Sequence, residues 1–110
     1  MYKQGDIIFV PFSFSDEEKT KQRPVVVISK DSINNRSYIV VKITSVLNKS
    51  IYGMPIYQRD VDFTLEKTSE IITNDIMTIS ENRIIKRLGK MKKDALIKLI
   101  DRIQDNFEIE

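Results

Sequence analysis

The sequence lacks two residue types that carry much of protein chemistry. It has no cysteine and no histidine among its 110 residues. Without cysteine there is no disulfide framework and no thiolate site. Without histidine the chain has neither the usual general base nor the commonest transition-metal ligand. Any enzymatic activity must therefore use other side chains.

Long apolar runs are missing as well. No stretch approaches the roughly 18 consecutive apolar residues that span a bilayer. Met1 is followed by the polar residues Lys3, Gln4 and Asp6, whereas a signal peptide has an apolar core. We therefore expect a cytoplasmic protein with no membrane partner.

Charge of one sign is scarce overall. The formal net charge is only +2, from 18 basic and 16 acidic residues, which does not by itself indicate nucleic-acid binding. The basic excess is local, because residues 1–55 hold eight Lys and Arg against five Asp and Glu, whereas residues 56–110 hold ten against eleven. A basic site is therefore expected in the first half of the chain.

The most informative stretch runs from Gln22 to Ser29, with the sequence QRPVVVIS. Arg23 keeps its charge near neutral pH, and its fork of donors suits a phosphate. Pro24 has no amide hydrogen and a fixed φ, which best fits the first residue of a strand. The unbroken run 25–28 predicts a strand buried on both faces. Arg23 would then sit at the mouth of a rigid strand; an ordinary surface ion pair is the alternative.

Two further groups of polar residues are candidates for phosphate contacts. Lys19, Lys21 and Arg23 alternate with neutral residues, so an extended chain would place them on one side, where they could track a phosphodiester backbone. A solvated patch without function is the alternative. Thr44 and Ser45 end the third predicted strand, where hydroxyls can donate to a phosphate but are also common turn residues.

Short apolar segments predict a mainly β chain. Expected strands cover residues 7–10, 25–28, 38–43, 54–57 and 70–79, the last with a bend near 74–75, while 84–91 fits a strand or a short helix. Pro55 favours an edge position for the fourth strand. One helical turn fits within 30–37, and another can begin at Ser80. At this length a small, partly open barrel is the expected architecture.

The C-terminal segment is predicted to form an amphipathic helix from Lys92 to Phe107. Its apolar residues recur at offsets of three or four, at Leu96, Leu99, Ile100, Ile103 and Phe107. We expect this helix to close the core or to cover one end of the sheet.

Acidic residues do not predict a metal site. Asp60, Asp62 and Glu66 could in principle hold Mg²⁺, but scattered surface carboxylates are far commoner than metal ligands. We expect neither a metal nor another cofactor.

Several of these segments together resemble a known family. Gly5-Asp6-Ile7, Pro11 and the polar loop into Arg23-Pro24 are similar to the opening of MazF/PemK/Kid-type toxins, the toxin halves of bacterial type II toxin–antitoxin pairs. Further matches follow in the same order, at 41–45 (VKITS), at 75–79 (DIMTI) and from 83–89 into the terminal helix. The resemblance covers nearly the whole chain.

The resemblance implies an SH3-like barrel, a homodimer, and a metal-independent, sequence-selective endoribonuclease that cleaves single-stranded RNA. Arg23 then matches the family's essential arginine, and Thr44 matches its catalytic threonine. Ser45 and Asp75 match positions that line the RNA groove in some members. The residues just before the arginine are assigned to RNA binding as well: Lys19, Lys21 and Gln22.

The first loop departs from the family pattern. It carries Asp16-Glu17-Glu18 and lacks the glycines and the histidine of several relatives. Thr73 stands where one branch of the family has a second arginine. The resemblance therefore leaves the cleavage sequence unassigned.

The chemistry of RNA is compatible with such an enzyme. RNA supplies its own nucleophile, the 2′-hydroxyl, so the protein needs only to align it and to stabilise charge on the phosphate. A cognate acidic antitoxin is expected to act at the basic groove around Arg23. Two other functions stay open, a CcdB-like toxin that binds a protein target such as DNA gyrase and a plain RNA-binding module. Arg23 and Thr44 at successive strand ends favour the ribonuclease.

Overall fold

The computed structural model describes residues 1–13 and 20–110. In that part of the chain the strands are β1 (Asp6–Ser13), β2 (Thr20–Val27), β3 (Ser37–Thr44), β4 (Gly53–Ile56), β5 (Ser69–Ser80) and β6 (Lys86–Lys90). The helical elements are α1 (Lys93–Asp105) and the short 3-10 turns η1 (Asp31–Ile33), η2 (Gln58–Asp60) and η3 (Glu81–Arg83). The predicted fold class, mainly β with a terminal amphipathic helix, is confirmed, and the ambiguous segment 84–91 contains a strand.

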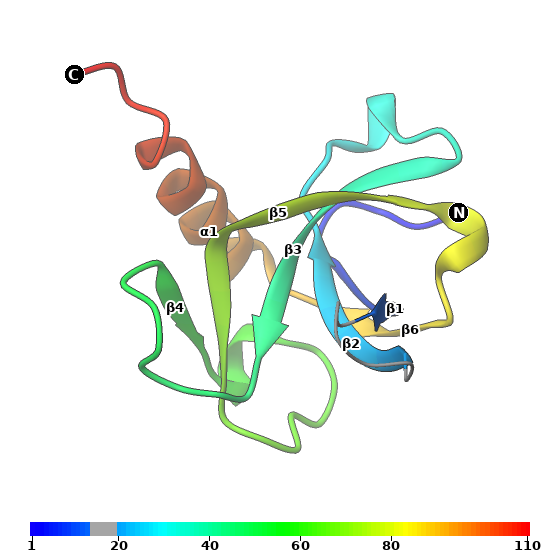
Figure 1. The fold of residues 1–110 in the computed structure, drawn as a ribbon, viewed down its shortest axis with the longest axis horizontal. Coiled ribbons are helices and arrows are strands. Elements are labelled where there is room, and N and C mark those ends of the chain that lie inside the picture. The colour runs from blue at the N-terminus through cyan, green and yellow to red at the C-terminus, as the bar shows by residue number, and fades with distance from the viewer. Residues whose placement is uncertain (14–19) are drawn as a thin grey trace.

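The strands form one antiparallel sheet that curls on itself (Figure 1). Their order is β4-β5-β3-β2-β1-β6, so β4 is an edge strand, as Pro55 predicted. The pairing of β3 with β5 shifts register between Val41↔Ile76 and Ile43↔Ile71. The bend predicted near residues 74–75 lies inside this shift.

Both faces of the central strands are buried. On one face, Val26 and Val41 share a core with α1, and on the other, Val25 and Val27 pack in a second core. These three β2 valines are all fully buried. Residues 25–27 have no polar alternation because neither face of the sheet meets water there, as predicted; Ile28, the last residue of the predicted run, lies beyond β2 and is half-buried.

The helix α1 covers one face of the sheet with every fourth residue. Ala95, Leu99 and Ile103 are buried, which confirms the amphipathic pattern. The helix ends at Asp105, so Phe107 lies beyond it and is 69% exposed; its predicted place on the apolar face is wrong. Among the described residues, no helix is long and apolar enough to cross a membrane.

The connection from β4 to β5 returns to the opposite edge of the sheet. Asp62 N–H donates to the Lys90 carbonyl (3.0 Å), and Lys90 N–H donates to Asp62 Oδ1 (2.7 Å). A Cβ at Gly89 would collide with the ring of Phe63, so only glycine allows the connection to lie this close to β6. This bridge partly closes the curled sheet into the expected barrel.

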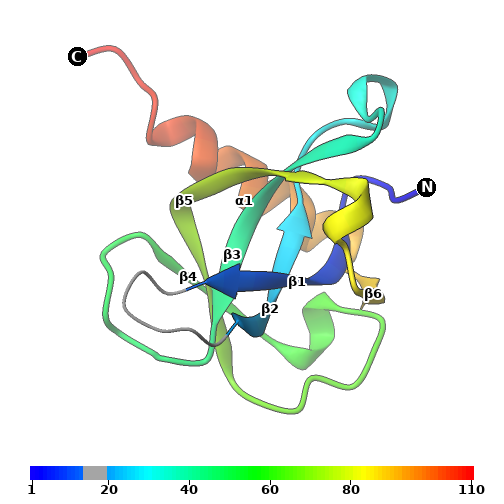
Figure 2. The ribbon, with the colours of Figure 1, turned by 45° about the vertical axis from the view of Figure 1, so that its right-hand side comes forward.

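The connections gather at two opposite ends of the strands. Figure 2 shows the β3–β4 and β4–β5 connections at one end, and η1 and η3 at the other. We call the first the groove end and the second the opposite end.

Candidate active site

The site lies where β2 and β3 part. The described pairing of these strands ends at Val25↔Lys42, and the preceding β2 residue is Pro24, which has no N–H to donate. Pro24 is the fifth residue of β2, not the first as predicted. It is tolerated there because β1 still pairs with it through Phe9, while its β3 side lies beyond the ladder. The proline thus stands where the two strands separate.

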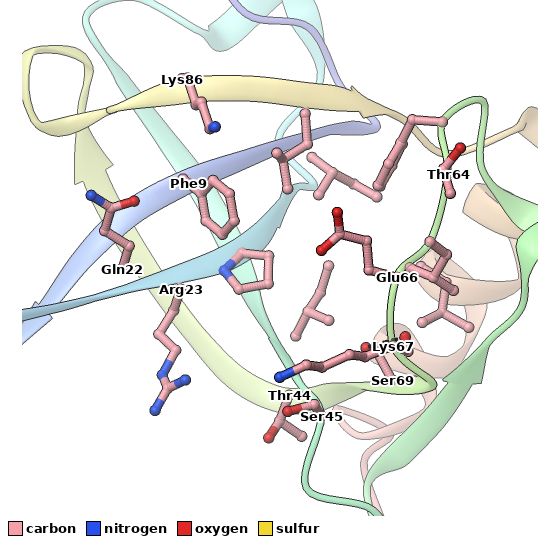
Figure 3. Close-up of a pocket in the computed structure, with 17 residues that line it drawn as sticks. Phe9, Gln22, Arg23, Thr44, Ser45, Thr64, Glu66, Lys67, Ser69 and Lys86 are labelled. Atoms are coloured by element: carbon pink, nitrogen blue, oxygen red, sulfur yellow. Dashed lines mark hydrogen bonds between the residues drawn. The ribbon is translucent and has the colours of Figure 1, made fainter.

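Arg23 and Thr44 face each other across this opening. Val25 lies opposite Lys42, so continuing the antiparallel register by two residues sets Arg23 opposite Thr44. Opposed residues of antiparallel strands present their side chains on the same face. Figure 3 shows Arg23 extending from β2 on one side of the opening, and Thr44 and Ser45 on the other.

Two hollows meet at these residues. The first hollow has a volume of about 460 Å³, and its lining includes Phe9, Gln22, Phe63, Glu66, Lys67 and Lys86. The second hollow has a volume of about 370 Å³, and its lining includes Lys42, Lys49, Ser50, Ile72 and Asp75. Arg23, Thr44 and Ser45 line both hollows. A groove therefore runs from one hollow to the other past these three residues.

The hydroxyl of Thr44 is oriented by the turn that follows β3. Val46 N–H donates to Thr44 Oγ1 over 3.1 Å, a typical hydroxyl turn. The oxygen acts as an acceptor in this bond, so the hydroxyl hydrogen can donate to a ligand. The adjacent Ser45 is exposed and offers a second hydroxyl.

Positive charge surrounds the opening. The cations that line the two hollows are Arg23, Lys42, Lys49, Lys67 and Lys86. Lys42 Nζ lies 3.9 Å from Asp75 Oδ2, and Lys86 Nζ lies 5.5 Å from the centroid of the Phe9 ring. Figure 3 shows the Lys67 amine directed toward the opening between Arg23 and Thr44. Such a groove suits an anionic chain.

Two aspartates of the β4–β5 connection stabilise the fold. Tyr57 N–H donates to Asp60 Oδ2 (2.8 Å), while Asp62 Oδ1 accepts from Lys90. In residues 1–13 and 20–110 no three Asp or Glu side chains are grouped so that they could hold a metal ion. Asp60 and Asp62 are therefore accounted for by the fold.

The family comparison decides which proteins this chain belongs with. Residues 3–107 match the model of the PemK-like, MazF-like toxins of type II toxin–antitoxin systems. The chain belongs to this toxin family.

Relatives of this toxin agree with the assignment. The endoribonuclease MazF of Staphylococcus epidermidis is 28% identical over 102 residues, which cover 90% of this toxin and 85% of that protein. A MazE–MazF structure from Deinococcus radiodurans has a TM-score of 0.79 and 12% identity, covering 99% of this chain and 97% of the other. An endoribonuclease in complex with its cognate antitoxin from a mycobacterial species has a TM-score of 0.76 and 10% identity over the full length of both chains. At such low identities, the two structures show that the fold is shared.

Most of the predicted site residues of the toxin come together at the groove. Those that line a hollow are Gln22, Arg23, Thr44, Ser45 and Asp75. Lys21 is exposed on β2 but lines neither hollow. Lys19 lies outside the described residues. The predicted row of three cations is therefore described only at Lys21 and Arg23.

Other groove residues were missed at the level of sequence. Lys67 and Lys86 were not singled out, and Glu66 was considered only as a metal ligand. All three lie in charged segments without a strand-end pattern, so nothing local distinguishes them from surface charges. They reach the groove because the β4–β5 connection crosses to β6.

Proposed function

We propose that this toxin is an endoribonuclease that cleaves single-stranded RNA in the cytoplasm and that a cognate acidic antitoxin neutralises it. The observation that carries the proposal is the pair Arg23 and Thr44 at the parted ends of β2 and β3. Membership of the toxin family supports it, as does the endoribonuclease name of the S. epidermidis relative.

The reaction moves the phosphodiester to the 2′-oxygen of the same nucleotide. The 2′-hydroxyl gives up its proton and attacks phosphorus, the bond to the 5′-oxygen breaks, and that oxygen takes up a proton. The products are a 2′,3′-cyclic phosphate and a 5′-hydroxyl. Because the nucleophile belongs to the RNA, the protein contributes alignment and stabilisation of the charge that builds on the phosphate.

Arg23 and Thr44 are assigned these two tasks. Arg23 binds the non-bridging oxygens through its planar fork and donates toward the leaving 5′-oxygen. The Thr44 hydroxyl donates to the same phosphate and holds it in line. The chain has no histidine to move protons efficiently, so modest turnover is expected. This scheme needs neither a metal nor a cofactor.

The lysines of the groove extend the contacts to neighbouring phosphates. Lys67 serves the first hollow, and Lys42 and Lys49 serve the second. RNA that enters through one hollow and leaves through the other passes Arg23 and Thr44. The bases must be unpaired to be read in such a groove, so single-stranded RNA is the substrate.

The antitoxin is assigned to the same groove. An acidic, partly disordered segment would occupy the phosphate sites and fold as it binds. Complementary charge would speed the encounter and make it sensitive to salt. Reversal of Lys19 and Lys21 to Glu should therefore slow antitoxin association and weaken RNA binding together. An unchanged association rate with weakened RNA binding would place neutralisation on another surface.

We also propose that the toxin forms a homodimer with C2 symmetry and an isologous interface. Apolar strands in excess of what one small barrel can bury would indicate such an interface. The central strands are not evidence of this kind, because one chain buries both of their faces. The proposal rests on the family resemblance. A light-scattering mass near the 12.9 kDa of one chain at micromolar concentration would contradict it.

The function is tested by incubating the purified protein with a long single-stranded RNA in EDTA and mapping the ends. We expect cuts at a recurring short sequence, with cyclic-phosphate and 5′-hydroxyl ends. Cleavage that is lost in EDTA and restored by Mg²⁺ would overturn the metal-free scheme. RNA that stays intact under both conditions would overturn the endoribonuclease itself.

A further inference from the structure

The first hollow has the size and lining of a site for a flat, partly polar group. Its volume of about 460 Å³ falls in the range of about 300–1,000 Å³ that is typical of ligand sites. Phe9, Phe63, Leu65 and Leu88 form apolar walls, and the hollow adjoins Arg23 at the opening. When RNA binds at that opening, the flat group next to a bound phosphate is a nucleobase, and unpaired bases stack on such walls.

The loop that forms one wall of the first hollow is held firmly. Gln58 Nε2 donates to the Phe63 carbonyl (2.6 Å), and Leu65 N–H donates to Gln58 Oε1 (2.8 Å). The paired bonds between Asp62 and Lys90 anchor the same loop to β6. The residue that follows Leu65 is therefore presented from a fixed backbone, as a specific contact requires.

That residue is Glu66, which projects into the hollow. Figure 3 shows its carboxylate pointing from the loop into the middle of the cavity. Within residues 1–13 and 20–110, this carboxylate has neither a hydrogen bond nor an ion pair. A negative charge beside a phosphate-binding site repels the RNA backbone, and a base that donates hydrogen bonds to this carboxylate offsets the repulsion.

Guanine is the base whose edge best fits a carboxylate. An ionised carboxylate only accepts hydrogen bonds, through two oxygens. The N1–H and N2–H groups of guanine are two adjacent, parallel donors, which both oxygens can accept at once. Adenine and cytosine place a ring acceptor beside their amino group, and uracil flanks its N3–H with two carbonyls. Each of these three bases would set a lone pair against the carboxylate.

We infer that the first hollow is a guanine subsite and that Glu66 is the residue that selects guanine there. The inference rests on the proposed function, because it assumes that RNA occupies the groove. The selected guanine lies at one fixed position close to the cleaved phosphate. Replacing Glu66 with Gln keeps the length of the side chain but exchanges one acceptor for a donor, so guanine should lose its advantage.

The test uses RNA that cannot be cleaved. Short 2′-O-methyl oligonucleotides of uridine, each carrying G, A, C or U at one central position, are titrated with the protein by fluorescence anisotropy. The wild type should bind the G oligonucleotide at least about tenfold more tightly than the other three, as expected for a bidentate pair. Glu66→Gln should reduce this preference to within about twofold. Glu108→Gln, which removes an exposed charge outside both hollows, should retain it.

Two base analogues sharpen the test. Inosine lacks the N2 amino group, so the wild type should lose most of its preference with inosine in place of guanosine. The affinity of Glu66→Gln should be the same for the inosine and guanosine oligonucleotides. In 7-deazaguanosine, N7 is missing but both donors remain, so wild-type binding should not change. Equal wild-type affinity for the four bases, a guanine preference that survives Glu66→Gln, or no measurable binding of any oligonucleotide would overturn the inference.

Cleavage mapping separates this inference from the proposed function. We expect the wild type to cut long RNA with guanine at one fixed position, and Glu66→Gln to cut with that position relaxed. Normal cleavage without such a guanine would overturn the guanine subsite alone. RNA left intact by the wild type would overturn the endoribonuclease, while the uncleavable oligonucleotides would still decide whether the hollow selects guanine.

Discussion

The two ends of the same strands treat their polar groups in opposite ways. At the opposite end, Tyr38 donates to Glu81 (2.8 Å) and accepts from Tyr2 N–H (3.2 Å), and Ser29 bonds Asn34 in a buried pair. At the groove end, the carboxylate of Glu66 has no partner within the described ranges. Polar residues at the first of these ends bind one another, whereas at the groove end the Glu66 carboxylate and the Thr44 hydroxyl line a cavity.

This contrast separates polar residues that stabilise the fold from polar residues that are available to a ligand. A buried polar group that is satisfied within the fold supports one conformation, and its loss leaves a partner unpaired. A polar group that faces a cavity adds little to stability but is ready for a ligand. Substitutions of the buried polar residues at the opposite end should therefore change unfolding, and substitutions of the polar residues that line the groove should change activity.

The largest effect is expected at Arg23 and Thr44. Arg23→Ala and Thr44→Ala should each lower RNA cleavage at least about a hundredfold, the usual cost of losing a donor to the transition state. Thr44→Ser keeps the hydroxyl and should keep most of the activity. The measurement is the single-turnover rate on one labelled RNA.

The matched control at the opposite end is Arg83→Ala, because Arg83 is exposed in η3. Its cleavage rate should equal that of the wild type, and all four variants should unfold at urea concentrations similar to that of the wild type. A wild-type rate in Arg23→Ala or Thr44→Ala would remove that residue from the mechanism.

The second effect is the converse and is expected at Asn34. Asn34 is 7% exposed, donates to the Ser29 carbonyl (3.1 Å) and bonds the Ser29 hydroxyl. Asn34→Ala removes the donor to the buried Ser29 carbonyl and the acceptor of the Ser29 hydroxyl, which keeps only its bond from Ile39 N–H (3.0 Å), so the free energy of unfolding should fall by about 1–3 kcal/mol in urea titrations. The neighbouring Asn35 is exposed, so Asn35→Ala should change it by less than about 0.5 kcal/mol. A loss of cleavage in folded Asn34→Ala would show that the two ends are not separate.

Sequence alone could predict the parts of the site that strands carry. Arg23 next to a proline and a buried run, and Thr44 at the end of another run, have local patterns that mark strand ends. The same reasoning found α1, because the spacing of Leu99 and Ile103 is a local property. The prediction that Pro24 begins its strand was wrong, because pairing with β1 extends β2 past the proline toward the N-terminus.

The remaining wall of the groove could not be predicted, because it depends on contacts between distant parts of the chain. Glu66 and Lys67 reach the site only because Asp62 bonds Lys90 and because Gly89 leaves room for an aromatic ring. In the sequence, both residues lie in a charged connection that could have pointed anywhere. Long-range packing converts these ordinary surface charges into groove residues.

The third effect is smaller and tests the charge of the groove at Lys67. A lysine that contacts one phosphate of a single strand releases counterions, so Lys67→Ala should lower the slope of log affinity against log salt by about 0.7. The affinity itself should fall a few-fold at low salt. Lys98 is exposed on α1, so Lys98→Ala should leave the slope unchanged. Equal slopes for wild type and Lys67→Ala would mean that RNA does not contact Lys67.

The smallest effect concerns the pH dependence of stability at the opposite end. Burial raises the pKa of Tyr38 above its usual value of about 10, the bond from Tyr2 N–H lowers it, and Glu81 raises it further. Below pH 10 or so both folded and unfolded Tyr38 keep the proton, so this residue adds no pH dependence. As pH rises beyond that value, the unfolded chain loses the proton first, so the folded state binds more protons and the free energy of unfolding falls.

Tyr38→Phe should start about 1 kcal/mol less stable, because it lacks the hydroxyl bonds. Its deficit relative to the wild type should shrink in urea titrations between about pH 9 and pH 11, because every other titrating group is common to both proteins. A deficit that stays constant across this range would show that Tyr38 does not titrate differently in the folded state.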